Sequence, residues 1–240
     1  MDVSCTCNKL FARLSRIVYP PRCVFCGVSG FADMDICESC YRGLPWIESS
    51  CTQCAIPLAD GSGNQLRCGH CLQKPPHFDH SLSLFSYEKN AVHLIRQLKF
   101  REKLACARLL GSMLADRVER ADAALPHCLL PVPLNKKRLR QRGFNQSVEL
   151  SREVVKRFGL MLDVSSVARV RDTQSQSGLD KQQRRKNIRG AFQVIRPVSA
   201  EHVVIVDDVV TTTSTVNELA RVLKKAGVKR VDVWSIARAV

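Results

Sequence analysis

Residues 203–215 read Val-Val-Ile-Val-Asp-Asp-Val-Val-Thr-Thr-Thr-Ser-Thr. The first four residues are apolar and β-branched, which predicts a strand buried on both faces that ends at Asp207 and Asp208. Hydroxyl side chains fill 211–215, and apolar residues then recur at helical spacing until the stop at Gly227. The stretch therefore predicts a strand, an acidic pair, a hydroxyl loop and the start of a helix.

Such a loop is suited to a phosphorylated sugar. The start of a helix offers N–H groups and the positive end of its dipole to a phosphate, and the hydroxyls add further donors. The carboxylates of Asp207 and Asp208 can accept hydrogen bonds from ribose hydroxyls or hold a hydrated Mg²⁺. The alternative is a surface turn with a threonine-rich helix cap, which we consider the weaker interpretation.

At these residues the chain resembles the type I phosphoribosyltransferases, whose signature is a hydrophobic strand, two acidic residues, two variable residues and a Thr-Thr-Gly-x-Thr loop. The resemblance implies a phosphoribosyl pyrophosphate site at Asp207, Asp208, Thr211, Thr212, Thr213, Ser214 and Thr215. Thr213 stands where the signature has glycine. A β-branched residue resists the positive φ that glycine adopts freely, so we expect either a loop without a left-handed residue or a distorted phosphate pocket.

The length of 240 residues accommodates one sizeable α/β domain and a small module. No apolar run approaches the ~18 residues of a membrane span. The first residues do not read as a secretory signal either, because Arg13, Ser15 and Arg16 interrupt the apolar stretch 10–18. That stretch predicts an amphipathic packing helix, and we expect a cytoplasmic protein.

The net charge of +15 is unevenly distributed. Residues 1–80 contain seven Lys or Arg and seven Asp or Glu, so the whole excess belongs to residues 81–240. A basic domain joined to a neutral module predicts a polyanionic partner, either the phosphates of a small substrate or a nucleic-acid backbone.

Eight of the twelve cysteines form four Cys-x-x-Cys knuckles: Cys23/Cys26, Cys37/Cys40, Cys51/Cys54 and Cys68/Cys71. Two knuckles complete a tetrahedral Zn²⁺ shell, so the eight thiolates predict two structural zinc sites. The spacers of ten, ten and thirteen residues favour two successive zinc ribbons. An interleaved pairing of knuckles one with three and two with four stays open. We thus predict an N-terminal helix at 1–20, a double zinc-ribbon module at 21–74 and a main domain at 80–240.

Three basic segments lie in the main domain. Residues 99–103 form a basic corner between two predicted helices, 91–100 and 104–118, and a solvated helix junction is an equally good interpretation. Residues 134–147 contain five cations and no acid, and they follow a predicted strand at 129–133. They should therefore lie on the same strand-end rim as the Asp207 loop. Residues 169–189 contain seven cations and two acids and predict a mobile loop.

Further motifs narrow the resemblance to the ComF family, which joins a zinc-ribbon module to a type I phosphoribosyltransferase-like domain: a parallel sheet flanked by helices. The motifs that carry it are Leu98-Lys99-Phe100, Pro131-x-Pro133, Arg138, Arg142-Gly143-Phe144-Asn145-Gln146, Arg169, Thr173-x-x-Gln176-x-x-Leu179, Arg184-x-x-Asn187-x-x-Gly190-Ala191-Phe192 and the Asp-Asp loop. The match extends from about Cys23 to Val240.

The resemblance implies a role in DNA uptake, competence or DNA utilisation. On this hypothesis the protein binds phosphoribosyl pyrophosphate with Mg²⁺, contacts single-stranded DNA, and works with DNA-uptake or helicase machinery. The pyrophosphate or DNA phosphates would be held by Lys99, Arg138, Arg142 and Arg184. No catalytic residue is assigned. Two alternatives stay open: a non-catalytic nucleic-acid-binding adaptor with a vestigial pocket, and a free-base salvage enzyme.

Overall fold

The computed structural model describes residues 20–58, 66–100, 104–121, 124–171 and 186–240. These residues divide into two compact units, 1–44 and 45–240. The predicted N-terminal helix and Arg184 lie outside the described residues. Of the helices that the structure describes, none combines the length and the apolar composition that crossing a membrane requires.

The first unit is built around the first two cysteine knuckles. A tight turn carries Cys23 and Cys26, and a bridge joins Arg22 to Ser29. The short helix α2 (Glu38–Arg42) begins at Cys37, whose sulfur accepts the N–H of Cys40. Buried apolar residues are few here, so the unit depends on its cysteines for a fixed shape.

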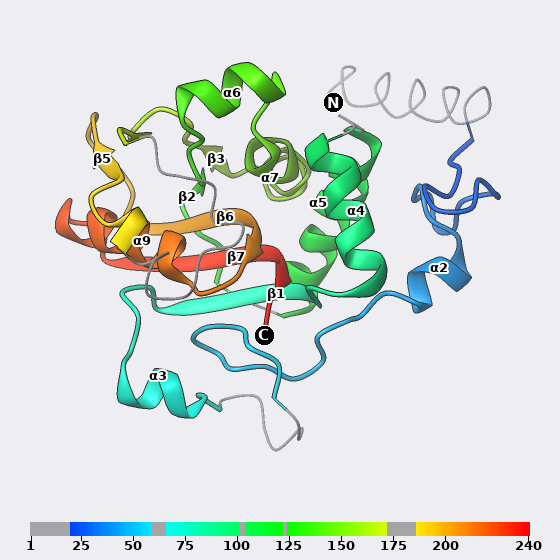
Figure 1. The fold of residues 1–240 in the computed structure, drawn as a ribbon, viewed down its shortest axis with the longest axis horizontal. Helices are drawn as coiled ribbons and strands as arrows, with labels where there is room; N and C mark the ends of the chain where they lie inside the picture. Colours follow the sequence, from blue (N-terminus) through cyan, green and yellow to red (C-terminus); the bar gives the residue numbers. More distant parts are fainter. Residues whose placement is uncertain (1–19, 59–65, 101–103, 122–123, 172–185) are drawn as a thin grey trace, which may run out of the picture. The chain divides into compact units, whose positions relative to one another are not determined.

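The second unit contains a five-stranded, fully parallel sheet in the order β1-β7-β6-β2-β3 (Figure 1). Its strands are β1 (His80–Ser86), β2 (Cys128–Pro131), β3 (Met161–Leu162), β6 (His202–Val210) and β7 (Arg230–Arg238). A separate antiparallel pair joins β4 (Val167–Arg169) to β5 (Phe192–Val194). The predicted parallel sheet is confirmed.

The helices of the second unit are α3 (Gly69–Gln73), α4 (Lys89–Phe100), α5 (Leu104–Arg120), α6 (Lys136–Arg142), α7 (Gln146–Phe158) and α9 (Ser214–Lys225). Of these, α5, α7 and α9 pack against strands of the sheet. The chain leaves β2 through α7 toward β3, and it leaves β6 through α9 in the opposite direction along the sheet. Right-handed crossovers therefore place α7 and α9 on opposite faces (Figure 1).

This topology creates a switch point between β2 and β6, the neighbouring strands from which the chain departs in opposite directions. In open α/β sheets, ligands bind beyond the carboxyl ends of the strands at such a point. The segments that follow β2 and β6 are the basic helix α6 and the hydroxyl loop 211–213. The fold thus brings the basic helix α6 and the hydroxyl loop together beyond the carboxyl ends of β2 and β6.

One expectation needs correction. The strand β6 does not end at Asp207 but continues to Val210, because Val209 and Val210 still pair with Ala237 and Arg238 of β7. In the basic segment 134–147, residues 136–142 form the helix α6. Asn135 starts that helix by accepting the N–H of Arg138 at 2.8 Å, and Gly143 ends it with a φ of 75°.

The third and fourth knuckles belong to the second unit. Cys51, Cys54 and Cys71 are buried in the same apolar cluster as residues of β6 and α9. Main-chain hydrogen bonds join this segment to β1: Ile47 donates to Leu84 at 2.9 Å, and Ser81 donates to Thr52 at 3.0 Å. The module boundaries at 74 and 80 stay a prediction, but the second cysteine set packs as part of the core beside the sheet.

Candidate functional site

The acidic pair of β6 is buried at the carboxyl end of the strand. Asp207 is 9% exposed and Asp208 is 4% exposed. Burial, together with the neighbouring charge of Asp208, raises the pKa of Asp207 well above its usual value of 3.8. Oδ1 of Asp207 accepts the N–H of Asp208 at 2.9 Å, which fixes the carboxyl group against the main chain. A buried carboxylate at a strand end is costly to keep and is typical of a binding site.

Lys99 supplies the countercharge for this pair. Its Nζ forms an ion pair with Oδ2 of Asp208, and the lysine side chain is 22% exposed. Burial opposes the charged ammonium, but the attraction of Asp208 outweighs it and raises the lysine pKa above 10.5. The sequence placed Lys99 among the phosphate ligands, whereas the structure places it against the proposed sugar ligand Asp208.

The hydroxyl loop contains a left-handed residue at the position where the signature has glycine. Thr213 has a φ of 59° and a ψ of −5°, the left-handed conformation. Among the described non-glycine residues with positive φ, Thr213 is the β-branched one. The expectation of a loop without a left-handed residue is therefore wrong, because the chain accepts the backbone strain at this position.

The hydroxyls of the loop are organised locally. Oγ1 of Thr213 donates to the carbonyl of Thr212 at 2.6 Å and does not cap α9, whose first residue is Ser214. The hydroxyls of Thr212 and Ser214 lie 2.9 Å apart and share a hydrogen bond. The start of α9 is thus left without a side-chain cap from Thr213, and its N–H groups and dipole favour an anion in the loop.

The basic helix α6 presents two different faces. Arg138 and Arg142, one helical turn apart, are half-buried, whereas Lys136, Lys137 and Arg140 are exposed. Burial lowers the pKa of Arg142, and the charge of Asp208 partly restores it, so this guanidinium lies within electrostatic reach of the acidic pair. Only the half-buried face can serve the switch point.

The Arg-Gly-Phe-Asn-Gln motif has a structural explanation. Gln146 accepts a 2.5 Å hydrogen bond from Nη1 of Arg142. Asn145 starts α7 by accepting the N–H of Ser147 at 3.0 Å, and its Nδ2 donates to the carbonyl of Val132 just beyond β2. The motif therefore fastens the loop to the end of the strand and aims Arg142.

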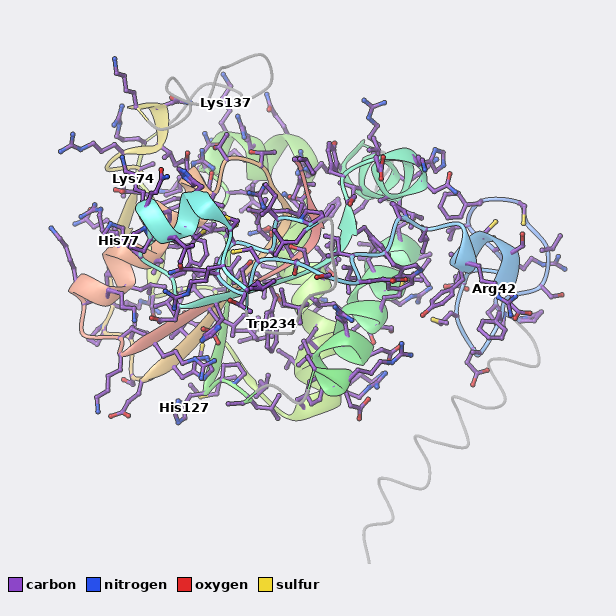
Figure 2. The ribbon with its side chains drawn as sticks, turned by 90° about the horizontal axis from the view of Figure 1, so that it is seen from below. Arg42, Lys74, His77, His127, Lys137 and Trp234 are labelled. Carbon is purple, nitrogen blue, oxygen red and sulfur yellow. The ribbon has the colours of Figure 1, made fainter. Side chains whose placement is uncertain are left out.

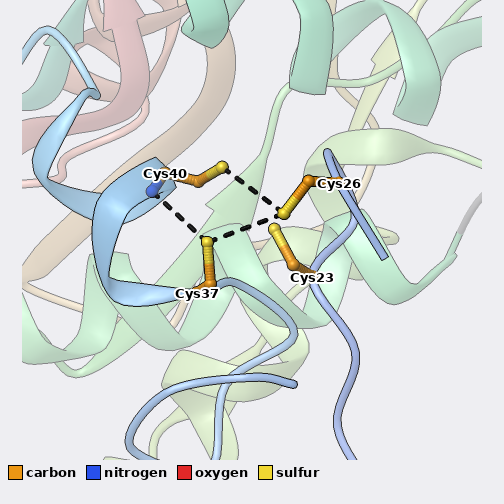
Figure 3. Close-up of side chains that lie close together, drawn as sticks. All are labelled: Cys23, Cys26, Cys37 and Cys40. Carbon is orange, nitrogen blue, oxygen red and sulfur yellow. Dashed lines mark hydrogen bonds between the residues drawn. The ribbon is translucent and has the colours of Figure 1, made fainter. Parts of the chain in front are cut away.

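Both cysteine sets fit zinc. Within each set the four sulfur atoms lie within 4.8 Å of one another. Cys26 and Cys37 have their sulfurs 3.7 Å apart (Figure 3), and Cys54 and Cys68 show the same separation. A tetrahedron of sulfurs about 2.3 Å from a central Zn²⁺ has edges of about 3.8 Å, whereas a disulfide needs about 2.05 Å. The sets are those of successive ribbons, which confirms that pairing over the interleaved one.

Each cysteine set contains one thiol whose pKa is lowered beside thiols whose pKa is raised, since burial raises the pKa of Cys54 to about 11 and that of Cys40 to about 12. Burial opposes ionisation of Cys51, but N–H groups of Cys68, Cys54 and Gln53 donate to its sulfur and lower its pKa to about 7. In the other set, the pKa of Cys23 falls to about 6 for the same reason. Thiolates at neutral pH are the form that binds Zn²⁺.

Comparisons with known proteins support this architecture. The double zinc ribbon domain family matches residues 14–72, and the phosphoribosyl transferase domain family matches residues 145–239. The DNA utilization protein YhgH of Salmonella typhimurium is 36% identical over 229 residues, which are 93% of this chain and 100% of the relative. Competence protein F of Haemophilus influenzae is 31% identical, over 91% of this chain and 97% of the relative. The chain belongs to the ComF/YhgH family.

A search of solved structures adds a distant match. Hypoxanthine phosphoribosyltransferase from Staphylococcus aureus is 12% identical, with a TM-score of 0.35, over 56% of this chain and 72% of the enzyme. The assignment to the ComF/YhgH family rests on the sequence relatives and on the two domain families.

One functional contact was missed by sequence reasoning. Arg238, the last residue of β7, is 6% exposed, and its guanidinium contacts both Cys54 and the start of the hydroxyl loop. A single arginine after an apolar strand gives only a weak indication of such a role, since a cation at the end of a buried strand needs partners.

Proposed function

We propose that this protein binds phosphoribosyl pyrophosphate with Mg²⁺ at the switch point between β2 and β6. The observation that carries the proposal is the φ of 59° at Thr213. The loop has a left-handed residue at the position where the signature has glycine, although glycine is absent. Maintaining that strain at a β-branched residue is expected where the loop shape is needed for a ligand.

The roles of the residues follow from their positions. Asp207 and Asp208 would hold the ribose hydroxyls, and the loop from Thr211 to Thr215 would hold the 5′-phosphate at the start of α9. Arg138 and Arg142 would hold the pyrophosphate from the opposite side of the switch point, because their guanidinium forks match phosphate oxygens. Lys99 would balance the buried carboxylates.

The acidic pair also fits a magnesium site, since Mg²⁺ is held in proteins by one or two carboxylates together with substrate oxygens. When bound, the ion would neutralise charge on the pyrophosphate. A transfer reaction here would break the bond between ribose C1 and the pyrophosphate and form one to a nitrogen nucleophile. The departing pyrophosphate would be stabilised by Arg138 and Arg142.

A second function concerns single-stranded DNA. The names of the relatives refer to DNA utilisation and competence. In this chain, Lys136, Lys137 and Arg140 are exposed on α6, and Figure 2 shows Lys137 directed outward. We infer a cytoplasmic protein whose outer α6 face tracks a DNA backbone, in contact with DNA-uptake or helicase machinery.

The rival hypothesis is a DNA-binding adaptor whose phosphoribosyl pocket is vestigial. Ribose 5-phosphate and pyrophosphate, titrated separately, distinguish the two. Under the proposal, Thr215→Val weakens ribose 5-phosphate binding and spares pyrophosphate binding, whereas Arg142→Gln does the reverse. Equal effects of each variant on both ligands, or no binding of either at millimolar concentration, would support the adaptor.

A further inference from the structure

Arg238 is a buried cation held by main-chain carbonyls. Its Nε donates to the carbonyl of Cys54 at 2.8 Å, and its Nη1 donates to Val210 at 3.2 Å. The same Nη1 lies against the carbonyls of Thr211 and Ala239. All four acceptors belong to the backbone, so the guanidinium fixes the course of the chain and is not used to neutralise a carboxylate at these atoms.

The two segments that Arg238 joins have different functions. Val210 is the last residue of β6, and Thr211 is the first residue of the hydroxyl loop, two residues before Thr213. Cys54 belongs to the second cysteine set, which is far away in the sequence. Because the guanidinium is planar and rigid, its Nε and Nη1 cannot be reoriented independently. A shift of the Cys54 carbonyl is therefore transmitted to the carbonyls of Val210 and Thr211.

The position of the Cys54 carbonyl depends on the knuckle around it. The N–H of Ala55 donates to the carbonyl of Cys51 at 2.8 Å, and the N–H of Cys51 donates to Ile56 at 2.9 Å. Ala55 itself has a φ of 55°, which an alanine adopts only at a cost. Metal binding at the four sulfurs would favour this strained turn, because two thiolates from one knuckle must converge on one point.

The second unit contains another contact between the same parts. The N–H of His77, a few residues beyond the second cysteine set, donates to Oδ1 of Asn217 on α9 at 2.6 Å. The second ribbon thus contacts the start of the phosphate loop through Arg238. The segment that follows the ribbon contacts α9, the helix after the loop, through Asn217.

We propose that Arg238 is a positioning residue that couples the metal site of Cys51, Cys54, Cys68 and Cys71 to the phosphate loop. Metal in this site raises the affinity of the loop for a ribose phosphate. By thermodynamic reciprocity, the ligand raises the affinity of the site for its metal by the same factor. The coupling rests on the proposed function and involves the same ligand. Whether Arg238 holds the phosphate loop in place can be tested without a ligand.

The first experiment needs no ligand. Hydrogen exchange of residues 207–217 is compared in the zinc-loaded full chain, in Arg238→Lys and in Arg230→Lys. Arg230 is the first residue of the same strand, at the end opposite to Arg238, and is the matched control. Lysine keeps the charge but cannot span the carbonyls of Cys54 and Thr211. Exchange should rise at least about tenfold in Arg238→Lys and stay unchanged in Arg230→Lys, with two zinc ions retained by both.

Unchanged loop exchange in a folded Arg238→Lys would overturn the proposal. If that variant fails to fold, the wild type decides the matter through zinc release to a chromogenic chelator. Release from the second site should slow about fivefold or more in saturating phosphoribosyl pyrophosphate with Mg²⁺. Release from the site in residues 1–44 is the internal reference and should not change, and Cys26→Ser identifies its phase.

The failures are distinguishable. If calorimetry detects phosphoribosyl pyrophosphate binding but zinc release from the second site is the same with and without it, the coupling is wrong and the proposed function survives. If calorimetry detects no binding, the proposed function fails. The role of Arg238 in holding the loop is then still tested by the exchange experiment, or by hydrogen exchange of the wild type after the second-site metal is removed. After that removal, unchanged exchange at 211–215 contradicts the role of Arg238.

Discussion

Lys99 and Asp208 meet as an ion pair inside the second unit, with the aspartate side chain 6% exposed. They come from α4 and β6, so the contact joins a helix to the strand that carries the acidic pair. The lysine therefore holds a charged carboxylate in place at a site where no water could fully solvate it. Under the proposed function, a ligand whose hydroxyls bind Asp208 would meet a carboxylate whose charge Lys99 already compensates.

Replacing Lys99 by methionine should destabilise the second unit. Asp208 would be left buried without its countercharge, which costs about 1–3 kcal/mol. Urea unfolding measures the effect, with Arg96→Met as the control because Arg96 is an exposed residue of the same helix. Adding Asp208→Asn to Lys99→Met should recover part of the loss. Strictly additive effects of the two changes would contradict a direct pair.

Asp207→Asn should stabilise the protein and remove its ligand binding. The folded state raises the pKa of Asp207 above 3.8, so it holds a proton that the unfolded chain has released. Stability is therefore lost as pH rises from 3.8 through the folded pKa, and asparagine avoids this loss while keeping Oδ1 as an acceptor for Asp208. Thermal unfolding from pH 4 to pH 8 should show a gap that widens with pH. A variant less stable than wild type at pH 8 would contradict the assignment.

Thr213→Gly should raise the free energy of unfolding by about 0.5–1 kcal/mol. Glycine removes a steric cost of about 1–2 kcal/mol from the folded state. Its greater freedom in the unfolded chain lowers the stability by about 0.5–1 kcal/mol. Ligand affinity should tighten or stay within about twofold, since the loop already has the required shape. Thr212→Gly is the control, because Thr212 lacks a positive φ and its replacement should destabilise. A strong loss of affinity in Thr213→Gly would instead identify its hydroxyl as a phosphate donor.

The two cysteine sets should respond differently to mutation. Elemental analysis should find two zinc ions per chain and one in either Cys23→Ser or Cys51→Ser. Cys23→Ser should disorder the first unit and leave the second folded, whereas Cys51→Ser should also lower the melting temperature of the second unit, where Cys51 is fully buried. One metal or none in the wild-type chain would refute the two-site assignment.

Removing exposed cations of α6 should weaken DNA binding in a salt-dependent way. Each of Lys137→Gln and Arg140→Gln should reduce the slope of log affinity against log salt by about 0.7 for single-stranded DNA. Phosphoribosyl pyrophosphate affinity should not change in these variants, but it should fall in Arg142→Gln. Fluorescence anisotropy at several salt concentrations provides the measurement. DNA affinity that does not depend on salt would rule out a phosphate-tracking surface.

The central strands β2 and β6 could be predicted because apolar runs make up most of each strand. The predicted strand at 129–133 is β2 with a shift of one or two residues, and the predicted helix at 104–118 is α5. The eight cysteine ligands could also be predicted, since the Cys-x-x-Cys spacing of each knuckle is itself typical of a zinc site. In both cases the information lies within a few residues of the chain.

The missed features depend on contacts that sequence patterns do not encode. The helix α6 has five cations in seven residues and hardly any apolar periodicity, so it depends on Asn135 and Gly143 at its ends. The ion pair of Lys99 with Asp208 and the bridge of Arg238 to Cys54 join distant segments. Likewise, the packing of Cys51 beside the sheet could not be read from a spacing that resembles the first ribbon.

The central claim is that the loop after β6 and the basic helix after β2 form one working site. Calorimetric titration of the zinc-loaded chain with phosphoribosyl pyrophosphate, in the presence and absence of Mg²⁺, tests it most directly. We expect saturable, Mg²⁺-dependent binding of one ligand per chain that is lost in both Asp207→Asn and Asp208→Asn. Absence of binding at millimolar ligand, or binding that persists unchanged in both variants, would contradict it.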